Sequence, residues 1–473
     1  MKTIKLINKK TSLVLGLILL LTMGCERELS DDVAPATFSN TAEIFTDNFV
    51  GLGSNFYFPY SDGFAKPDIF KVDSEVSYIG SSSLRIDVPN EFGDPGGSYA
   101  GAFFRVDGAG RDLTEYNALT FWVKSTGAPF IQSFGFGQSE VQDFQTSISN
   151  FQLSTTWTKV IIPIPNASVL TEERGMFWLV ALPDNGAGYS FWIDELKFEN
   201  LGTIGQVRPI ISNGLDATGI GFIGESLSIS GVGVTSNLGN GQDVSVVASP
   251  NYFAFSSSDP SVANANGNLV SLVGEGTATI TAQIGNTDAE GSLTVSSTAL
   301  APTPTLDPSN VISVFSDTYT NSPVDYFNGY WAPFQTTQGQ DDININGNNI
   351  IKYTELNFVG TEFQGAKTID ASSMTHFHID ILVEQTLDPG DFLRIVLQDL
   401  GSDNVFGGVP DRAGSITLTS TSSTPLVNGS WISVDVPLSS FGGLSTRSNL
   451  AQIVYVSDAT VPSIFVDNIY FHN

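Results

Sequence analysis

Four aspartates stand at matching places in two parts of this chain, and their spacing suggests a cation site. Asp194 lies in Ser190-Phe-Trp-Ile-Asp-Glu-Leu-Lys-Phe-Glu-Asn200, and Asp467 lies in Ser463-Ile-Phe-Val-Asp-Asn-Ile-Tyr-Phe-His-Asn473. Asp47 and Asp317 open the same two parts. Carboxylates that meet need a cation, and oxygen ligands suit Ca²⁺. We predict structural calcium at both pairs. The alternative is that the acids are solvated or accept hydrogen bonds from local backbone amides.

Aromatic residues offer a second kind of chemistry, the binding of a flat apolar surface. Tyr326-Phe-Asn-Gly-Tyr-Trp-Ala-Pro-Phe334 lacks strand alternation and is followed by three glutamines, at positions 335, 338 and 340. A neutral sugar ring has an apolar face and a rim of hydroxyls, so an aromatic ring beside amides or acids can bind it. We predict Trp331 as the platform, with Tyr330 and Tyr326 beside it. The alternative is that these rings plug the end of a sandwich.

The first part of the chain carries similar candidates. Tyr57 and Tyr60 follow Asp47 at the equivalent place, and Trp178 must face the opposite side of its strand from Phe177, so that one of them can line a sheet face. Arginine side chains can bond sugar hydroxyls or pair with the many acids; the candidates are Arg85, Arg174 and Arg394.

Two further sets of residues favour structural roles. His376 and His378 have metal-ligand spacing, but we expect no third ligand nearby and therefore favour a structural role for both. Trp122 and Trp157 lie in strong strand patterns, so we expect them in the core.

The elements that position these residues are strands. In both closing segments apolar residues alternate, and the phase slips by one at the aspartate: Phe191 and Ile193 share a face, but the next pair is Leu196 and Phe198. A one-residue slip predicts a β-bulge. Short strands separated by turn signals predict an all-β chain with two jelly-roll sandwiches. The resemblance given below for the middle part implies an immunoglobulin-like sandwich between them. The strands expected in the first part are 83–88, 102–106, 118–123, 130–136, 157–162, 177–181 and 191–198.

The N-terminus reads as a targeting segment. Residues 1–24 combine a basic start with a short apolar run, typical of a signal peptide. Thr22-Met-Gly-Cys25 resembles a bacterial lipobox, which implies lipidation of Cys25; the alternative is an ordinary cleaved signal peptide. Residues 25–42 read as a polar, acidic tether, similar to the export signal of Bacteroidetes surface lipoproteins. We therefore expect a lipid anchor on the outer face of the outer membrane.

Composition limits the partners. The chain of 473 residues has 49 acidic and 20 basic residues, a net charge of −29. Such a field repels nucleic acid and sulfated glycans. Cys25 is the single cysteine, so no disulfide within the chain is possible.

Three folded parts are expected, and we name them by their ranges: the N-terminal sandwich (43–200), the middle part (205–298) and, after a Pro-rich linker (299–308), the C-terminal sandwich (309–473). In the middle part, the segments Ser256-Ser-Ser-Asp-Pro260 and Gly276-Thr-Ala-Thr279 resemble the bacterial immunoglobulin-like domain of group 2, which implies a spacer.

The outer parts share features with a known family in several segments: 78–86 and 191–196 in the N-terminal sandwich, and 348–353, 356–360, 369–378 and 466–473 in the C-terminal one. In these segments both outer parts resemble carbohydrate-binding modules. The whole chain is similar to surface glycan-binding lipoproteins of polysaccharide-utilisation systems. That likeness implies capture of a neutral polysaccharide, laminarin (a β-1,3-glucan) first, beside an outer-membrane glycan transporter complex.

The sequence predicts a binding protein and not an enzyme. A glycosidase needs two carboxylates about 5–10 Å apart, and Asp194-Glu-Leu-Lys-Phe-Glu199 only partly resembles the acids of family 16 glucanases. A surface adhesin or structural lipoprotein is the alternative, and a glycoside hydrolase comes after it.

Overall fold

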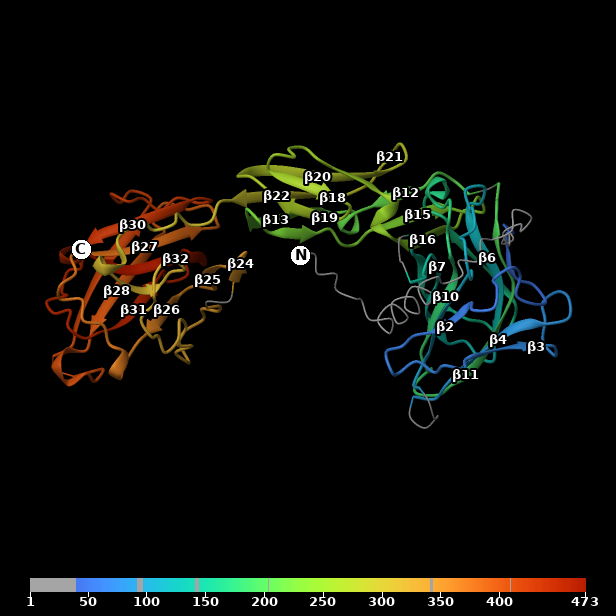
Figure 1. Ribbon diagram of the computed structural model, residues 1–473, viewed down its shortest axis with the longest axis horizontal. Helices are drawn as coiled ribbons and strands as arrows, with labels where there is room; N and C mark the ends of the chain where they lie inside the picture. Colours follow the sequence, from blue (N-terminus) through green and yellow to red (C-terminus); the bar gives the residue numbers. More distant parts are fainter. Residues whose placement is uncertain (1–39, 92–96, 141–143, 203, 341–342, 409) are drawn as a thin grey trace, which may run out of the picture.

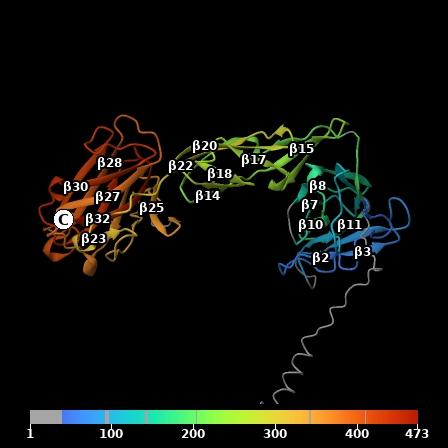
Figure 2. The same cartoon turned by 45° about the horizontal axis from the view of Figure 1, so that its top comes forward.

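The computed structural model describes residues 40–91, 97–140, 144–202, 204–340, 343–408 and 410–473. The predicted signal peptide, Cys25 and all of the tether before Asn40 lie outside these residues. Both figures show an arc, with the middle part between the two sandwiches (Figures 1 and 2). Among the described residues, no helix is long and apolar enough to cross a bilayer.

Strands dominate the described chain, which confirms the predicted all-β class. The helices among these residues are single 3₁₀ turns: Ala167–Val169, Ser212–Gly214, Pro250–Tyr252, Pro308–Asn310, Gly365–Lys367, Gly401–Asp403 and Leu438–Ser440.

The N-terminal sandwich has two facing sheets. The first has the order β3-β4-β11-β6-β9, with β1 against β11. Its strands are β1 (Glu43–Phe45), β3 (Phe70–Asp73), β4 (Ser83–Val88), β6 (Ala118–Ser125), β9 (Thr158–Pro163) and β11 (Tyr189–Glu199). The second has the order β8-β7-β10-β5-β2. Its strands are β2 (Tyr57–Pro59), β5 (Ala100–Arg105), β7 (Phe130–Phe136), β8 (Thr146–Gln152) and β10 (Gly175–Ala181).

The core of this sandwich is aromatic. Phe121, Phe134, Phe177 and Phe191 are fully buried, with ring centroids between 5.1 and 6.0 Å apart. Burying each ring removes a large apolar area from water, so this cluster holds the two sheets together.

The C-terminal sandwich repeats this layout. One sheet has the order β24-β25-β32-β27-β30, with β23 against β32, and the other has the order β26-β31-β28-β29. The first contains β23 (Val311–Phe315), β24 (Ile343–Ile345), β25 (Asn348–Thr354), β27 (His376–Val383), β30 (Trp431–Pro437) and β32 (Ser463–His472). The second contains β26 (Phe358–Glu362), β28 (Phe392–Asp399), β29 (Arg412–Thr419) and β31 (Leu450–Val456).

The predicted bulge is present in both closing strands. The register of β11 against β6 shifts between Asp194 and Lys197, and that of β32 against β27 shifts next to Asp467. The residue after each aspartate, Glu195 or Asn468, has a positive φ of 51° or 50°. The opening strands β1 and β23 pair with these closing strands, so the chain ends of each sandwich are neighbours.

The middle part does not stand apart from the N-terminal sandwich. β12 (Arg208–Ile210), β15 (Gly233–Asn237) and β16 (Asp243–Ala248) continue its second sheet in the order β12-β15-β16-β8. The rest forms one sheet of β13 (Asp216–Phe222), β17 (Ala254–Ser257), β20 (Gly276–Ile284), β21 (Thr287–Asp288) and β22 (Ser292–Thr298). Another sheet contains β14 (Ser226–Ser228), β18 (Ala263–Asn266) and β19 (Leu269–Leu272).

Smaller contacts join the middle part to the C-terminal sandwich. Phe222 packs with Phe465 and Leu382 in a separate apolar cluster. The indole Nε1 of Trp431 donates a hydrogen bond to the carbonyl of Ala299, 2.8 Å away. The linker is therefore held against the C-terminal sandwich.

Candidate functional site

The aromatic loop of the C-terminal sandwich is held by one buried amide. Asn328 is 3% exposed, and its Nδ2 donates to the carbonyls of Thr337 and Gly339. Its Oδ1 accepts hydrogen bonds from the backbone amide of Tyr330 and from Nε2 of Gln335. These bonds close the loop into a fixed shape, so the rings that it carries are placed before any ligand arrives.

The ring of Trp331 lies against the outer face of the sheet β26-β31-β28-β29. A Cβ built on Gly360 of β26 would stand 2.1 Å from Cη2 of the indole, so the ring occupies the space that a side chain would need. Phe358 lies beside it, with ring centroids 6.2 Å apart. Trp331 is half-buried, whereas Tyr330 is 50% and Phe334 76% exposed. The loop does not plug the sandwich, and its predicted rings face solvent or the sheet surface.

Glu362, which the sequence analysis missed, lies on the same face of β26, two residues after Gly360. Glu362 is 6% exposed and accepts hydrogen bonds from the Tyr326 hydroxyl at 2.5 Å, from Nε2 of Gln364 at 2.5 Å and from Nε2 of Gln452 at 3.2 Å. Burial, followed by the bond to Glu362, raises the pKa of Tyr326 to about 12. The phenol therefore stays protonated and donates its hydrogen to the carboxylate.

Strand register places further polar side chains on this outer face. Glu362 is paired with Gln452, which is paired with Gln398, and side chains of directly paired residues share a face. Arg394 lies four residues before Gln398 and therefore on the same side of β28, with its guanidinium 5.7 Å from the Phe392 ring. The face thus combines an aromatic ring with a carboxylate, amides and an arginine.

The N-terminal sandwich carries a comparable face on β2, β5 and β10. Phe58 and Phe103 are stacked, with ring centroids 5.1 Å apart and planes within 9°. Trp178 is paired with Phe103 and lies over Gly135, whose added Cβ would come within 2.4 Å of the indole. Tyr60 lies over Gly101 in the same way, and its hydroxyl donates to Oε1 of Gln138 at 2.7 Å. Tyr60 and Trp178 therefore lie on one outer face, with Trp178 only 7% exposed. The sequence analysis left open whether Phe177 or Trp178 takes this side.

The structure contradicts the prediction that Tyr57 lies on a glycan-binding face. Its ring points inward, 4.5 Å from the Phe70 ring and 5.3 Å from the Phe104 ring, and its hydroxyl donates to the Pro67 carbonyl. Its neighbour Phe58 takes the outward position, because successive side chains of a strand face opposite sides. Tyr57 is half-buried and packs against the core, so its ring does not lie on the face of Tyr60 and Trp178.

A second correction concerns the tryptophans expected in the core. Trp122 is half-buried and stacks on Tyr78 with centroids 4.0 Å apart, and Trp157 meets the same ring edge-on at 5.8 Å. Both lie on the outer side of the six-stranded sheet that contains β6. An alternating pattern fixes which residues share a face but does not say which face is buried.

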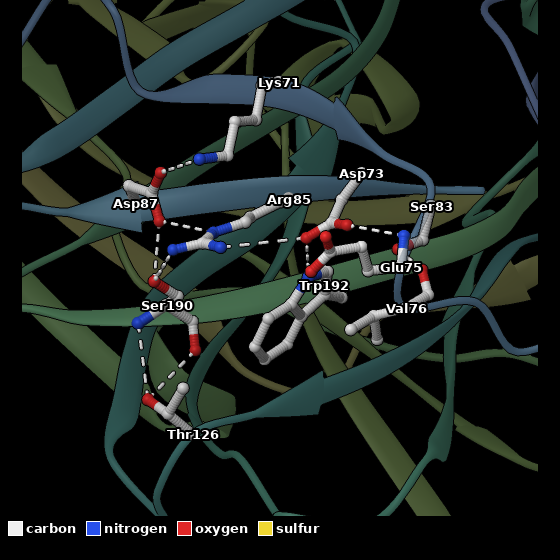
Figure 3. Close-up of polar contacts among 10 residues, drawn as sticks. All are labelled: Lys71, Asp73, Glu75, Val76, Ser83, Arg85, Asp87, Thr126, Ser190 and Trp192. Atoms are coloured by element: carbon white, nitrogen blue, oxygen red, sulfur yellow. Dashed lines mark hydrogen bonds and ion pairs between the residues drawn. The ribbon is translucent and has the colours of Figure 1, made fainter.

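Arg85 uses its charge within the fold. Figure 3 shows its guanidinium between Asp87, at 2.7 Å, and Asp73, at 3.7 Å, across β3 and β4. The indole of Trp192 and the hydroxyl of Ser190 donate to the same two carboxylates. The Trp192 hydrogen bond is the largest cause that lowers the pKa of Asp73.

The other two candidate arginines, Arg174 and Arg394, differ in their partners. Arg174 pairs with Glu140 at 3.5 Å, as does Arg105 at 3.0 Å. Arg394 is thus the arginine of the three candidates that lies on a sheet face with the predicted aromatic platform.

The aspartate pairs differ between the two sandwiches. In the N-terminal one, Asp194 accepts hydrogen bonds from the backbone amides of Tyr78, Ile79 and Glu195, and Asp47 accepts them from Ser81 and Ser82. These bonds match the alternative to a calcium site, in which the acids accept hydrogen bonds from local backbone amides. Burial raises the pKa of Asp194, although the hydrogen bonds from the backbone amides act in the opposite direction. The pKa of Asp47 is lowered by the hydrogen bonds from the amides of Ser81 and Ser82.

In the C-terminal sandwich one carboxylate oxygen is left without a partner. Asp467 is 1% exposed, and its Oδ1 accepts the amide of Asn468 while its Oδ2 has no hydrogen bond. Burial, with the nearby charges of Asp317 and Asp380, raises its pKa to about 7. Asp317 itself accepts two hydrogen bonds from Asn349. The sequence has a further acidic pair, Asp341-Asp342, which we expect to be solvated loop charge; it lies outside the described residues.

All three histidines of the chain lie together, which the sequence analysis did not foresee. His472 stacks on His376 at 5.2 Å, and Asp435 lies 3.2 Å from Nε2 of His472 and 3.4 Å from Nδ1 of His378. An acid and a third histidine are therefore present. In the described part of the chain, however, no group of three or more histidine, cysteine or acidic side chains could hold a metal ion.

Comparison with known proteins supports a carbohydrate-binding module at one end of the chain. Residues 41–200, about a third of the sequence, match the family model of carbohydrate binding domain 30. No curated protein matches the chain.

Several solved structures resemble the fold. A crystal structure of a family 30 carbohydrate-binding module is 20% identical and covers 34% of this chain and 87% of its own, with a TM-score of 0.25. The family 30 module of a cellulosomal cellulase of Clostridium thermocellum is 21% identical over 34% of this chain and 96% of its own (TM-score 0.25). A tandem pair of family 22 modules from Paenibacillus barcinonensis is 12% identical, covers 93% of this chain and 99% of its own, and has a TM-score of 0.22. Likeness at this level carries no argument about the ligand.

Proposed function

We propose that this protein captures a neutral polysaccharide and does not cleave it. Laminarin is the leading candidate for this ligand. The observation that carries the proposal is the Trp331 ring laid on the outer sheet face over Gly360, next to the hydrogen-bonded Glu362 and Gln452. A sugar ring can stack on the indole while its hydroxyls meet the carboxylate and amides. The family match of residues 41–200 supports a carbohydrate-binding role at the other end of the chain.

The surrounding charge favours an uncharged ligand. The net charge of −29 repels polyanionic glycans over the range of the Debye length. Hydrogen bonds and stacking, which do not depend on ligand charge, therefore supply the binding energy.

Affinity electrophoresis of soluble protein that starts after Cys25 tests this proposal. Gels contain laminarin, mixed-linkage β-glucan, starch or the polyanion alginate. We expect retardation in laminarin and a weaker retardation for Trp331→Ala. Trp122→Ala is the matched control, because Trp122 is also half-buried but lies on a different face. Retardation in no gel would favour a surface adhesin, and release of reducing sugar would favour a glycoside hydrolase.

We propose that the protein is anchored by lipid on Cys25 at the outer face of the outer membrane, beside a glycan transporter complex. The signal-peptide pattern of residues 1–24 and the lipobox resemblance support this location. Metabolic labelling with a palmitate analogue, with Cys25→Ser as the control, tests the anchor. Protease added to intact cells should remove the protein if it faces outward.

We also propose a structural calcium ion in the C-terminal sandwich, held by Asp467 and Asp317. The unpartnered Oδ2 of buried Asp467 supports it, because an isolated buried carboxylate is costly and a cation would neutralise it. Asp47 and Asp194 already accept backbone amides, so their pair fits a cation less well. Chelator should lower the melting temperature of the protein and have no effect on Asp467→Asn. An unchanged melting temperature for the unsubstituted protein would contradict calcium binding.

A further inference from the structure

Direct strand pairing builds one row of residues across the sheet that the N-terminal sandwich and the middle part share. Starting at β2, the paired residues run Phe58, Phe103, Trp178, Gly135, Ser147 and Val247. Because directly paired residues point to the same side of a sheet, these side chains share one outer face. The row begins on the aromatic face described above and ends on β16 of the middle part.

The junction that places β16 is well packed. Val247 and Ala248 pair with Ser147 and Thr146, and the amide of Ser249 donates to the Gln145 carbonyl at 2.8 Å. Tyr252 is 3% exposed, and its hydroxyl donates to the carbonyl of Phe144 at 2.8 Å. The buried residues of both parts belong to one continuous apolar cluster. This packing fixes the position of β16 relative to the aromatic row.

A hollow of about 410 Å³ lies at this junction. Its lining combines an aromatic ring, small polar side chains and an exposed apolar one: Gln145, Ser147, Trp178, Val247, Ala248, Ser249 and Pro250. Val247 is 59% exposed, although it is a β-branched apolar residue directly in line with Trp178. The lining contains no charged side chain, so it matches an uncharged ligand with both apolar and hydroxyl surface.

We propose that the middle part contributes residues to the glycan-binding face of the N-terminal sandwich. The polysaccharide chain lies along the row from Phe58 to Val247 and fills the hollow beside β16. This rests on the proposed function, and it replaces the role of a mere spacer. Five strand spacings separate β2 from β16 in the sheet order. At about 4.8 Å per spacing the row is about 24 Å long, which accommodates several sugar units end to end.

The test substitutes Val247 in full-length soluble protein that carries Trp331→Ala, so that the C-terminal face contributes little. Calorimetric titration with laminarin measures the affinity of Val247→Asp and Val247→Lys. Both should weaken binding at least tenfold, because either charge would be desolvated against a neutral ligand. Leu269→Asp is the control: Leu269 is 43% exposed in the same part but lies on β19, in a different sheet. It should bind like its parent, and all variants should keep their melting temperatures.

The outcomes separate this inference from the proposed function. If the parent binds and Phe103→Ala weakens binding while both Val247 variants bind normally, the middle part is a spacer and the inference is wrong. If Val247→Asp and Val247→Lys change the affinity in opposite directions, the ligand is charged, which contradicts a neutral glycan. If protein without any substitution binds no glycan, the proposed function itself fails.

Discussion

Replacing Gly360 by alanine should weaken glycan binding without touching any residue that meets the sugar. The new Cβ would stand 2.1 Å from Cη2, 2.5 Å from Cζ2 and 3.0 Å from Cζ3 of the Trp331 indole. Carbon atoms in contact lie about 3.5–4.0 Å apart, so the ring has to lift or turn by more than about 1 Å. The backbone of Gly360 has an ordinary φ, and alanine suits a strand interior better than glycine, so the fold should not suffer.

The expected loss follows from what the ring supplies. Complete removal of an aromatic platform, as in Trp331→Ala, should cost about 1–3 kcal/mol of binding free energy. Alanine at position 360 displaces the ring but does not delete it, so we expect a smaller loss of about 0.7–2 kcal/mol. At 1.4 kcal/mol per factor of ten, this is about a 3- to 30-fold increase in Kd.

Calorimetric titration with laminarin measures the change, and ¹⁹F NMR of protein containing 5-fluorotryptophan shows whether the ring has moved. The spectrum of Trp331→Phe identifies the Trp331 resonance. Gly442→Ala is the matched control, since nothing lies within 4 Å of the position of its added Cβ. A shifted Trp331 resonance together with an unchanged Kd would refute the role of this ring as the platform.

Three further predictions follow from single residues. Glu362→Gln, which keeps the shape but loses the charge that strengthens bonds from Tyr326 and Gln452, should raise the Kd for laminarin about fivefold (~1 kcal/mol) by titration. Arg111→Met should lower the free energy of unfolding in urea by about 2–4 kcal/mol, because this buried guanidinium donates to three carbonyls of the N-terminal segment; a loss below 1 kcal/mol would contradict that role. In calcium-free buffer the melting temperature should fall as the pH rises from 5 to 8. The pKa of Asp467 is raised to about 7, so its stabilising protonated form is lost through that pH, and Asp467→Asn should flatten the profile.

The sequence predicted well those structural features that depend on residues adjacent in the chain. The strands 83–88 and 130–136 were predicted with the bounds that the structure has. The bulges at Asp194 and Asp467 were readable because a phase slip in an alternating strand is a property of adjacent residues. Short strands were missed, among them β2 and β3, because three or four residues carry too little periodicity to recognise.

One readable signal of the binding faces went unused. Trp331, Trp178 and Tyr60 each lie over a glycine of a neighbouring strand, and a glycine inside a strand marks a close approach of other atoms. Gly101, Gly135 and Gly360 could have pointed to these faces. The partner ring of each glycine could not be named, because it comes from a different strand or loop.

By itself the sequence determined the all-β class, the repeated layout of the two sandwiches, the acidic charge and the aromatic loop around Trp331. These follow from composition and from patterns within a few residues. Tertiary structure alone decided that Phe58 and not Tyr57 faces outward, that Glu362 meets Gln452, and that β16 joins the sheet of the N-terminal sandwich. Each of these depends on pairing between distant strands, and register between distant strands is set by packing of the whole core and not by neighbouring residues.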